Sequence, residues 1–257
     1  TSGGDTTAED GVTTLREAIA ASNSDAAVGT TVPAGTTDND VITIAVSEVT
    51  LTQGELPIIG DVTITGAATI IASPDARIFN ITTDSANPVA LSGITLTGGA
   101  PLAANVNGNG GAVLVGAGAV VTMTGVTLEG NRSPADEAGE GGGAIFNAGT
   151  LTLDGVTVDD NGVTGAADNG GGVMNAATGT LTITNGAITE NFAGRAGGGI
   201  ENAGGMVTIT GLNLSDNTVG GMPGNGGGLH SGGGTVTYNG GMITTNVAAR
   251  EGGGFWT

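Results

Sequence analysis

The stretch Gly141–Asn161, GGGAIFNAGTLTLDGVTVDDN, recurs with small changes through the second half of the chain. Further copies occupy residues 170–191, 197–217 and 226–246, and another begins at Gly252. The glycine triplets end at residues 143, 172, 199, 228 and 254, which are 29, 27, 29 and 26 residues apart. A repeat of about 20 to 50 residues is typical of proteins built from stacked units. We therefore expect each copy to form one layer of a stack.

Each copy contains three short runs in which apolar and hydroxyl-bearing residues alternate. In the second copy, Leu181 and Ile183 lie between Thr180, Thr182 and Thr184. Alternation with a period of two is the pattern of a half-buried β-strand. Three strands in about 28 residues match one coil of a parallel β-helix. We predict an all-β solenoid whose equivalent inward residues are Leu151, Leu181, Val207 and Val236.

Asparagines recur at two equivalent places in the copies. One set follows the last strand of each copy and comprises Asn131, Asn161, Asn191, Asn217 and Asn246. The other set follows the glycine triplets and comprises Asn147, Asn175 and Asn202, with Ser231 in the same place in the fourth copy. Asparagine tolerates left-handed backbone geometry and can bond to neighbouring backbone groups. We expect these side chains to stack as amide ladders along the axis; the alternative is that they are ordinary surface turn residues.

The composition limits the classes of function. The chain of 257 residues has 52 glycines, no cysteine and only 2% aromatic residues, which predicts a narrow aliphatic core without disulfides. With 24 acidic residues against 5 basic ones, all of them arginine, the net charge is −19. An acidic surface argues against binding to nucleic acid and to anionic membranes. No apolar run approaches the length of a membrane-spanning helix, so no membrane insertion is expected.

One helix is predicted near the start of the chain, over residues 13–23. Thr14 and Glu17 form a capping box, and Leu15, Ala18 and Ile19 lie on one apolar face. We expect Thr14, Leu15, Glu17, Ala18 and Ile19 to cover the open first coil, since exposed strand edges invite pairing; binding of a partner by this helix is the alternative. The predicted organisation is an N-terminal cap and loop (1–40) and a β-helix (41–257), with irregular coils over 41–106 and regular coils over 107–257.

Several of these stretches occur together in one known family. TTLREAI (13–19), LTQGELPI (51–58), VTITG (62–66), RIFNI (77–81) and the GGGAIFN copies follow one another in order. This arrangement resembles the CSLREA-type right-handed parallel β-helix repeat proteins, although Thr13 and Thr14 stand where that family has Cys-Ser. GGGAIFN is also similar to repeats of the chlamydial polymorphic outer-membrane adhesins. The resemblance implies a right-handed parallel β-helix with a short N-terminal capping helix, and an extracellular or cell-surface location.

Catalysis on polysaccharides is one alternative, because other parallel β-helices are lyases and hydrolases. Such a site needs clustered carboxylates, or an aspartate-bound calcium ion with a basic residue. Asp154, Asp159 and Asp160 are near one another in sequence, and Arg195 and Arg250 precede glycine triplets. The single histidine, His230, takes the place held by Phe146, Met174 and Glu201 in other copies, and we expect that place to face solvent. No residue is assigned to catalysis.

Two binding alternatives also remain open. Asp–Asn pairs in TVDDNG (157–162) and LSDN (214–217) could hold a structural calcium ion, but the nonapeptide of calcium-binding β-rolls is absent. Thr152, Thr182, Thr208 and Thr237 take one place in successive copies, and a flat ladder of threonines could bind ice. Threonine is also simply a good strand former.

The function we expect is a non-catalytic secreted or cell-surface structural or adhesive module without a cofactor. Its expected partners are other copies of itself, other surface proteins or glycans. The chain given begins a coil at its end, with Phe255 and Trp256. That end could be an assembly surface for a head-to-tail filament, or the natural chain could continue beyond it.

Overall fold

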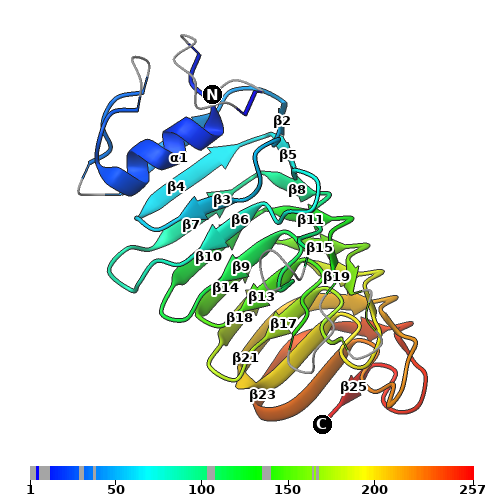
Figure 1. Cartoon of the computed structure of the whole chain (residues 1–257). Helices are drawn as coiled ribbons and strands as arrows, with labels where there is room; N and C mark the ends of the chain where they lie inside the picture. The colour runs from blue at the N-terminus through cyan, green and yellow to red at the C-terminus, as the bar shows by residue number, and fades with distance from the viewer. Residues whose placement is uncertain are drawn as a thin grey trace.

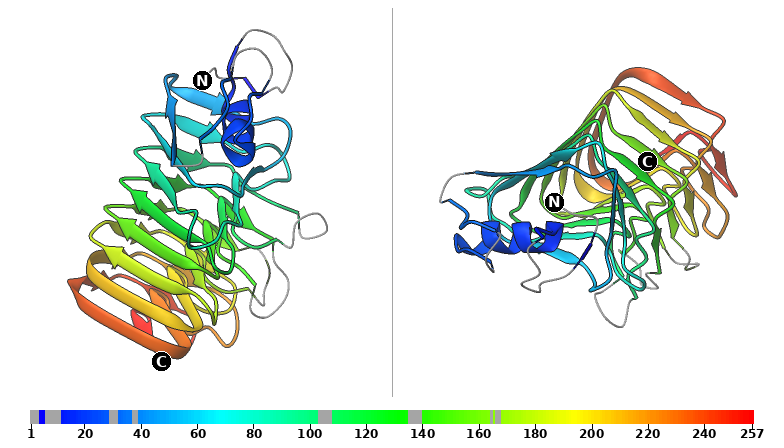
Figure 2. Two further views of the ribbon diagram at one scale, coloured as in Figure 1. Left: turned by 90° about the vertical axis from the view of Figure 1, so that its left-hand side faces the viewer. Right: turned by 90° about the horizontal axis from the view of Figure 1, so that it is seen from above.

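The computed structural model describes residues 4–5, 12–28, 32–36, 39–102, 108–134, 140–163, 165 and 168–257. Within them the chain winds as a parallel β-solenoid whose first coil lies under one short helix (Figures 1 and 2). The predicted boundary between irregular and regular coils, at residues 106 and 107, lies outside the described residues, as does most of the acidic loop that follows Pro134.

Three long ladders of parallel strands form the walls of the solenoid. Ladder A consists of β1 (Asp40–Ile44), β4 (Val62–Gly66), β7 (Val89–Ser92), β10 (Val120–Thr124), β14 (Thr150–Asp154), β18 (Thr180–Thr184), and parts of β21 (Ile200–Ser215) and β23 (Leu229–Thr244). Ladder B consists of β2 (Glu48–Thr50), β5 (Thr69–Ile71), β8 (Thr95–Thr97), β11 (Thr127–Glu129), β15 (Thr157–Asp159), β19 (Ala187–Thr189), and further parts of β21 and β23.

The third wall carries the segments that follow the glycine-rich turns. Ladder C consists of β3 (Leu56–Ile58), β6 (Phe79–Ile81), β9 (Val113–Val115), β13 (Ile145–Asn147), β17 (Val173–Asn175), the first residues of β21 and β23, and β25 (Phe255–Trp256). A short ladder D runs through β12 (Arg132–Ser133), β16 (Gly162–Val163), β20 (Phe192–Ala193), β22 (Thr218–Val219) and β24 (Val247–Ala248).

The inward residues stack as the alternation predicts. Leu151 pairs with Leu181, Leu181 with Val207, and Val207 with Val236. The first three are at most 1% exposed, and Val236 packs against the same core partly buried. Because slipping by one residue would turn every aliphatic side chain outward, this core also fixes the register of the coils. The prediction of stacked parallel coils with an aliphatic bore is confirmed.

Relative to the strand that follows, the glycine triplet of the first copy lies one residue earlier than the triplet of the second copy. Ile145 pairs with Val173, so Ala144, not Gly143, takes the place of Gly172. The middle position requires glycine because of close backbone contact: a Cβ on Gly171 would lie 2.3 Å from the Phe192 carbonyl oxygen and 2.4 Å from that of Gly198. Glycine is needed there because the backbones of neighbouring coils approach too closely for a side chain.

The helix α1 (Leu15–Ser24) begins at Thr14, and the capping box with Glu17 has both hydrogen bonds. Leu15 and Ile19 are buried in the same cluster as Ile42 and Ile44 of β1. Asn23 accepts hydrogen bonds from the amides of Ile59 and Gly60 and donates to the carbonyl oxygen of Pro57 at 2.8 Å. The helix therefore covers backbone groups next to β3 that would otherwise be an open edge.

Candidate functional site: a hydroxyl face on a stack joined by amide ladders

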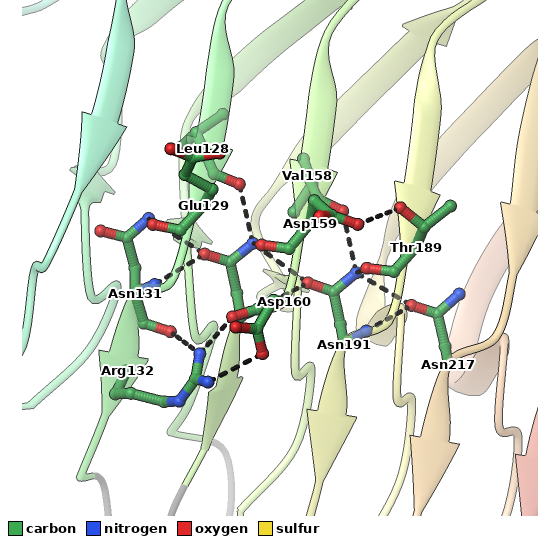
Figure 3. Close-up of polar contacts among 11 residues, drawn as sticks. Leu128, Glu129, Asn131, Arg132, Val158, Asp159, Asp160, Thr189, Asn191 and Asn217 are labelled. Carbon is green, nitrogen blue, oxygen red and sulfur yellow. Dashed lines mark hydrogen bonds and ion pairs between the residues drawn. The ribbon is translucent and has the colours of Figure 1, made fainter. Parts of the chain in front are cut away.

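The asparagines that end the ladder B strands lie directly above one another. We call Asn131, Asn161, Asn191, Asn217 and Asn246 the corner ladder. Asn161 donates from its backbone amide and from Nδ2 to Oδ1 of Asn191, at 3.0 and 3.1 Å. Each neighbouring pair repeats the two bonds, and Figure 3 shows the column from Asn131 to Asn217. The first four side chains are at most 1% exposed. The structure thus joins the predicted set into one continuous chain of amides.

The amides of Asn131, Asn161, Asn191 and Asn217 also bond to the backbone of two coils. Nδ2 of Asn161 donates to the carbonyl oxygens of Leu128, in the coil before, and of Asp159, two residues earlier, both at 2.9 Å. A buried polar group without a partner costs about 1–3 kcal/mol. Because these amides have hydrogen-bond partners, the column of asparagines can be buried without that cost. The bonds between asparagines run in one direction, from each asparagine to the one in the next coil.

We expected the asparagines at this corner to adopt left-handed backbone geometry, but the residue before each of them adopts it instead. The residue before each asparagine has positive φ, from 47° at Asp160 to 64° at Gly130. Thr245 also adopts it, at 55°, which is unusual for a β-branched residue. The preceding residue turns the chain, and the turn directs the asparagine side chain into the stack.

A second column, the strand ladder, lies on the inward side of ladder C. Nδ2 of Asn147 donates to Oδ1 of Asn175 at 2.8 Å, and Nδ2 of Asn175 donates to Oδ1 of Asn202 at 2.9 Å. Ser231 continues the column with a longer contact of 3.4 Å from Asn202. The three asparagines have no exposed surface.

Sequence reasoning missed an ionic clamp beside the cap. Asp5 is bonded by Arg16 through Nε at 2.7 Å and Nη2 at 3.1 Å, and by the amides of Thr52 and Gln53. Burial alone would raise the pKa of Asp5, but these hydrogen bonds and the Arg16 charge outweigh it and hold the pKa below its ordinary value. Arg16 also donates to the carbonyl oxygens of Gly54 and Glu55. Separations of 11 and 47 residues gave no local pattern by which to find this clamp.

The expectation that His230 faces solvent is wrong. The side chain of His230 is 12% exposed, and its Nδ1 lies 2.7 Å from Oε2 of Glu201, whose side chain is 5% exposed. The other neighbour of His230 along ladder C is Trp256, whose ring stacks on the imidazole at 4.8 Å between centroids and 9° between planes. His230 is thus covered by Glu201 of the coil before it and by Trp256 of the coil after it.

Burial raises the pKa of Glu201, and this effect exceeds the opposing hydrogen bond and charge of His230 and the charge of Arg195. A carboxylate, an imidazole and a guanidinium therefore influence one another here. We assign no reaction to them, because the imidazole is already engaged by Glu201 and covered by Trp256.

The structure does not bring the predicted acidic cluster together. Asp159 accepts a hydrogen bond from Thr189 across to the next coil, whereas Asp160 pairs with Arg132 at an exposed corner. Asp154 is exposed at the end of β14, and Arg250 is exposed after β24. Over the described ranges no group of three or more metal-ligating side chains is found, so the calcium hypothesis gains no assigned residues.

The outer side of ladder A presents a regular array of hydroxyl groups, which we call the hydroxyl face. One column contains Val41, Thr63, Ala90, Thr122, Thr152, Thr182, Thr208 and Thr237. A second column contains Thr43, Thr65, Ser92, Thr124, Asp154, Thr184, Thr210 and Asn239. All of these side chains are exposed or half-buried. The predicted alignment of Thr152, Thr182, Thr208 and Thr237 is therefore confirmed, and a second column runs beside it.

The comparisons add no relative. No family model, curated protein or solved structure matches the chain. In the described part of the chain, no helix has the length and apolar character needed to cross a membrane.

Proposed function

We propose that this chain is a non-catalytic structural and adhesive module of a secreted or cell-surface protein. The observation that carries the proposal is the pair of amide ladders, which join successive coils by side-chain hydrogen bonds in addition to strand pairing. Such a stack is stiff along its axis and presents the same side chains at a fixed interval on each wall. A repeated rigid surface suits binding to other extended structures rather than to one small molecule.

The resemblance to CSLREA-type proteins supports the extracellular or cell-surface part of this proposal. The acidic composition supports a soluble surface that does not bind nucleic acid, with a net charge of −19. The partners we propose are glycans, other surface proteins or further copies of the chain.

We do not extend the proposal to a filament joined through strand edges at the first coil. Such a filament needs a free edge there, but Asn23 and Arg16 of α1 already bond the backbone groups of residues 54–60. Phe255 is 43% exposed and Trp256 is half-buried against His230.

The test separates adhesion from catalysis. The purified chain is incubated with insoluble extracellular polysaccharides and with intact cells, and both the retained protein and the released sugar products are measured. We expect retention without release of new reducing ends or unsaturated uronates. Product release that disappears in Glu201→Gln would identify an enzyme and contradict the proposal. Absence of retention on every surface would remove the adhesive part.

A further inference from the structure

The hydroxyl face differs from the rest of this acidic protein in carrying almost no charge. The chain has 24 acidic and 5 basic residues, yet the two columns contain one charged side chain, Asp154. A third, shorter column beside them contains Val120, Thr150, Thr180, Met206 and Thr235, also without charge. Solubility alone would not select for this, because charged side chains are the usual solution on an exposed sheet face. The neutral array suits a ligand that is itself neutral.

The face is also regular in two directions. Neighbouring strands of a sheet lie about 4.7–4.9 Å apart, and alternate residues along a strand lie about 6.6–6.8 Å apart. The pairing is in register from Thr122 through Thr152, Thr182 and Thr208 to Thr237. Threonine is stiff about χ1, so each methyl and hydroxyl group keeps its place relative to the next. The result is a two-dimensional lattice rather than a pocket.

The side-chain chemistry distinguishes among neutral ligands. Binding surfaces for organic partners are enriched in aromatic side chains, which supply a large apolar contact area. None of the three columns contains an aromatic residue, and Tyr238, the aromatic residue of β23, pairs with the inward Ile209. Methyl and hydroxyl groups at fixed spacing instead offer hydrogen bonds and shallow apolar gaps to an ordered layer of water.

We propose that the hydroxyl face binds ice. Ordered water held by the threonine hydroxyls would be continuous with the crystal lattice, and the amide ladders keep the array from bending as it binds. Ala90 and Asp154 are the two clearest departures from the pattern, because one lacks a hydroxyl group and the other adds a charge. This inference does not depend on the adhesive proposal, since it concerns only one wall of the solenoid.

The experiment compares two substitutions in the same coil. Thr152→Lys places a long charged side chain in the middle of the hydroxyl face, whereas Thr157→Lys places the same side chain on ladder B, five residues away. Both threonines are half-buried and point outward. Thermal hysteresis, crystal shape and partition of the protein into growing ice are measured for the whole chain and both variants, after circular dichroism has shown that each is folded.

We expect the unmodified chain to partition into ice and to shape crystals, Thr152→Lys to lose most of that activity, and Thr157→Lys to keep it. Ala90→Thr combined with Asp154→Thr repairs the array and should increase hysteresis, an outcome that a merely folded control cannot produce. No hysteresis and no partition for the unmodified chain would overturn the proposal. So would equal loss in the two lysine variants, or adsorption to crystalline cellulose or chitin without adsorption to ice.

Discussion

The first coils and the later coils of this solenoid use different polar groups near the bore. At the start, the buried polar groups are charged: Asp5 is held by Arg16, and Arg77 lies 3.1 Å from Glu55. From Asn131 onward, two columns of neutral amides stacked on one another run beside the bore. The same places in the earlier coils are held by Gly99 for the corner ladder and by Val115 and Ile81 for the strand ladder.

The difference follows from what each group can stack on. An amide side chain both donates and accepts, so asparagine can bond to a copy of itself in the next coil and the pattern can continue through any number of coils. A carboxylate only accepts and a guanidinium only donates, so an ion pair needs two different residues and fits a unique place. Charged groups therefore suit the end of a stack, and amides suit its repeating part.

The largest effect is expected from interrupting the corner ladder. Asn191→Leu keeps the branching at Cγ but removes the acceptor for the Asn161 backbone amide and the donor to the Val158 and Thr189 carbonyl oxygens. We expect a loss of roughly 3 kcal/mol in the free energy of unfolding, because several buried hydrogen bonds are removed at about 0.5–1.5 kcal/mol each. Urea denaturation followed by circular dichroism measures it.

The matched control is Asn239→Leu on the exposed hydroxyl face, which should change stability by no more than about 0.5 kcal/mol. Equal losses in the two variants would mean that the ladder adds no stability beyond strand pairing. The difference in polar groups between the first and the later coils would then have no effect on the free energy of unfolding.

A second substitution extends the ladder toward the first coils. Val115 pairs with Asn147, so Val115→Asn would place a new amide beside Oδ1 of Asn147. Burying an unpartnered amide costs about 1–3 kcal/mol in proteins, which is the loss we expect for Val121→Asn on ladder A. We expect the loss of stability for Val115→Asn to be smaller than that for Val121→Asn by at least about 1 kcal/mol, because the neighbouring Asn147 can accept a hydrogen bond from the new amide. Thermal unfolding of the two variants compares them directly, and equal losses would contradict self-stacking as the principle.

The sequence predicts the ladders well and the charged contacts poorly, for a physical reason. Asn161 and Asn191 are recognisable because a stack repeats its chemistry at a fixed interval, so position alone indicates which residues meet. Asp5 and Arg16, or Glu201 and His230, meet only once. Their partners depend on where a unique loop or coil folds back, and no interval in the sequence encodes that distance. The residue type varies at the place of His230, which favours a solvent-facing side chain, but Glu201 and Trp256 of the adjacent coils cover it.

A third prediction concerns acid at the capped end. Because the folded pKa of Asp5 lies below its ordinary value of 3.8, its contribution to stability is present above that value and is lost as the pH falls through the folded pKa. Asp5→Asn keeps the shape but not the charge, and should lose roughly 2 kcal/mol at neutral pH, as charge-assisted hydrogen bonds are weakened. Measured by denaturation from pH 7 to pH 2.5, the difference between the two proteins should shrink below about pH 4. A constant difference across this range would show that the Asp5 carboxylate charge is not what holds the cap.

The smallest effect, and the opposite sign, is expected at Glu201 near the other end. Burial raises the folded pKa of Glu201 above its ordinary value of 4.5, so the folded state takes up a proton more readily than the unfolded state. The stability associated with this group is therefore fully present below pH 4.5 and is lost as the pH rises through the folded pKa. Glu201→Gln removes the buried charge while keeping an oxygen that can accept from His230, and should stabilise the protein by about 1 kcal/mol at pH 7.5 and not at pH 4. Thermal unfolding at the two pH values, with Glu190→Gln at an exposed turn as the control, measures the difference. A loss of stability at pH 7.5 would mean that the charge of Glu201 is matched by His230 and Arg195 after all, and that both ends of the stack use ion pairs in the same way.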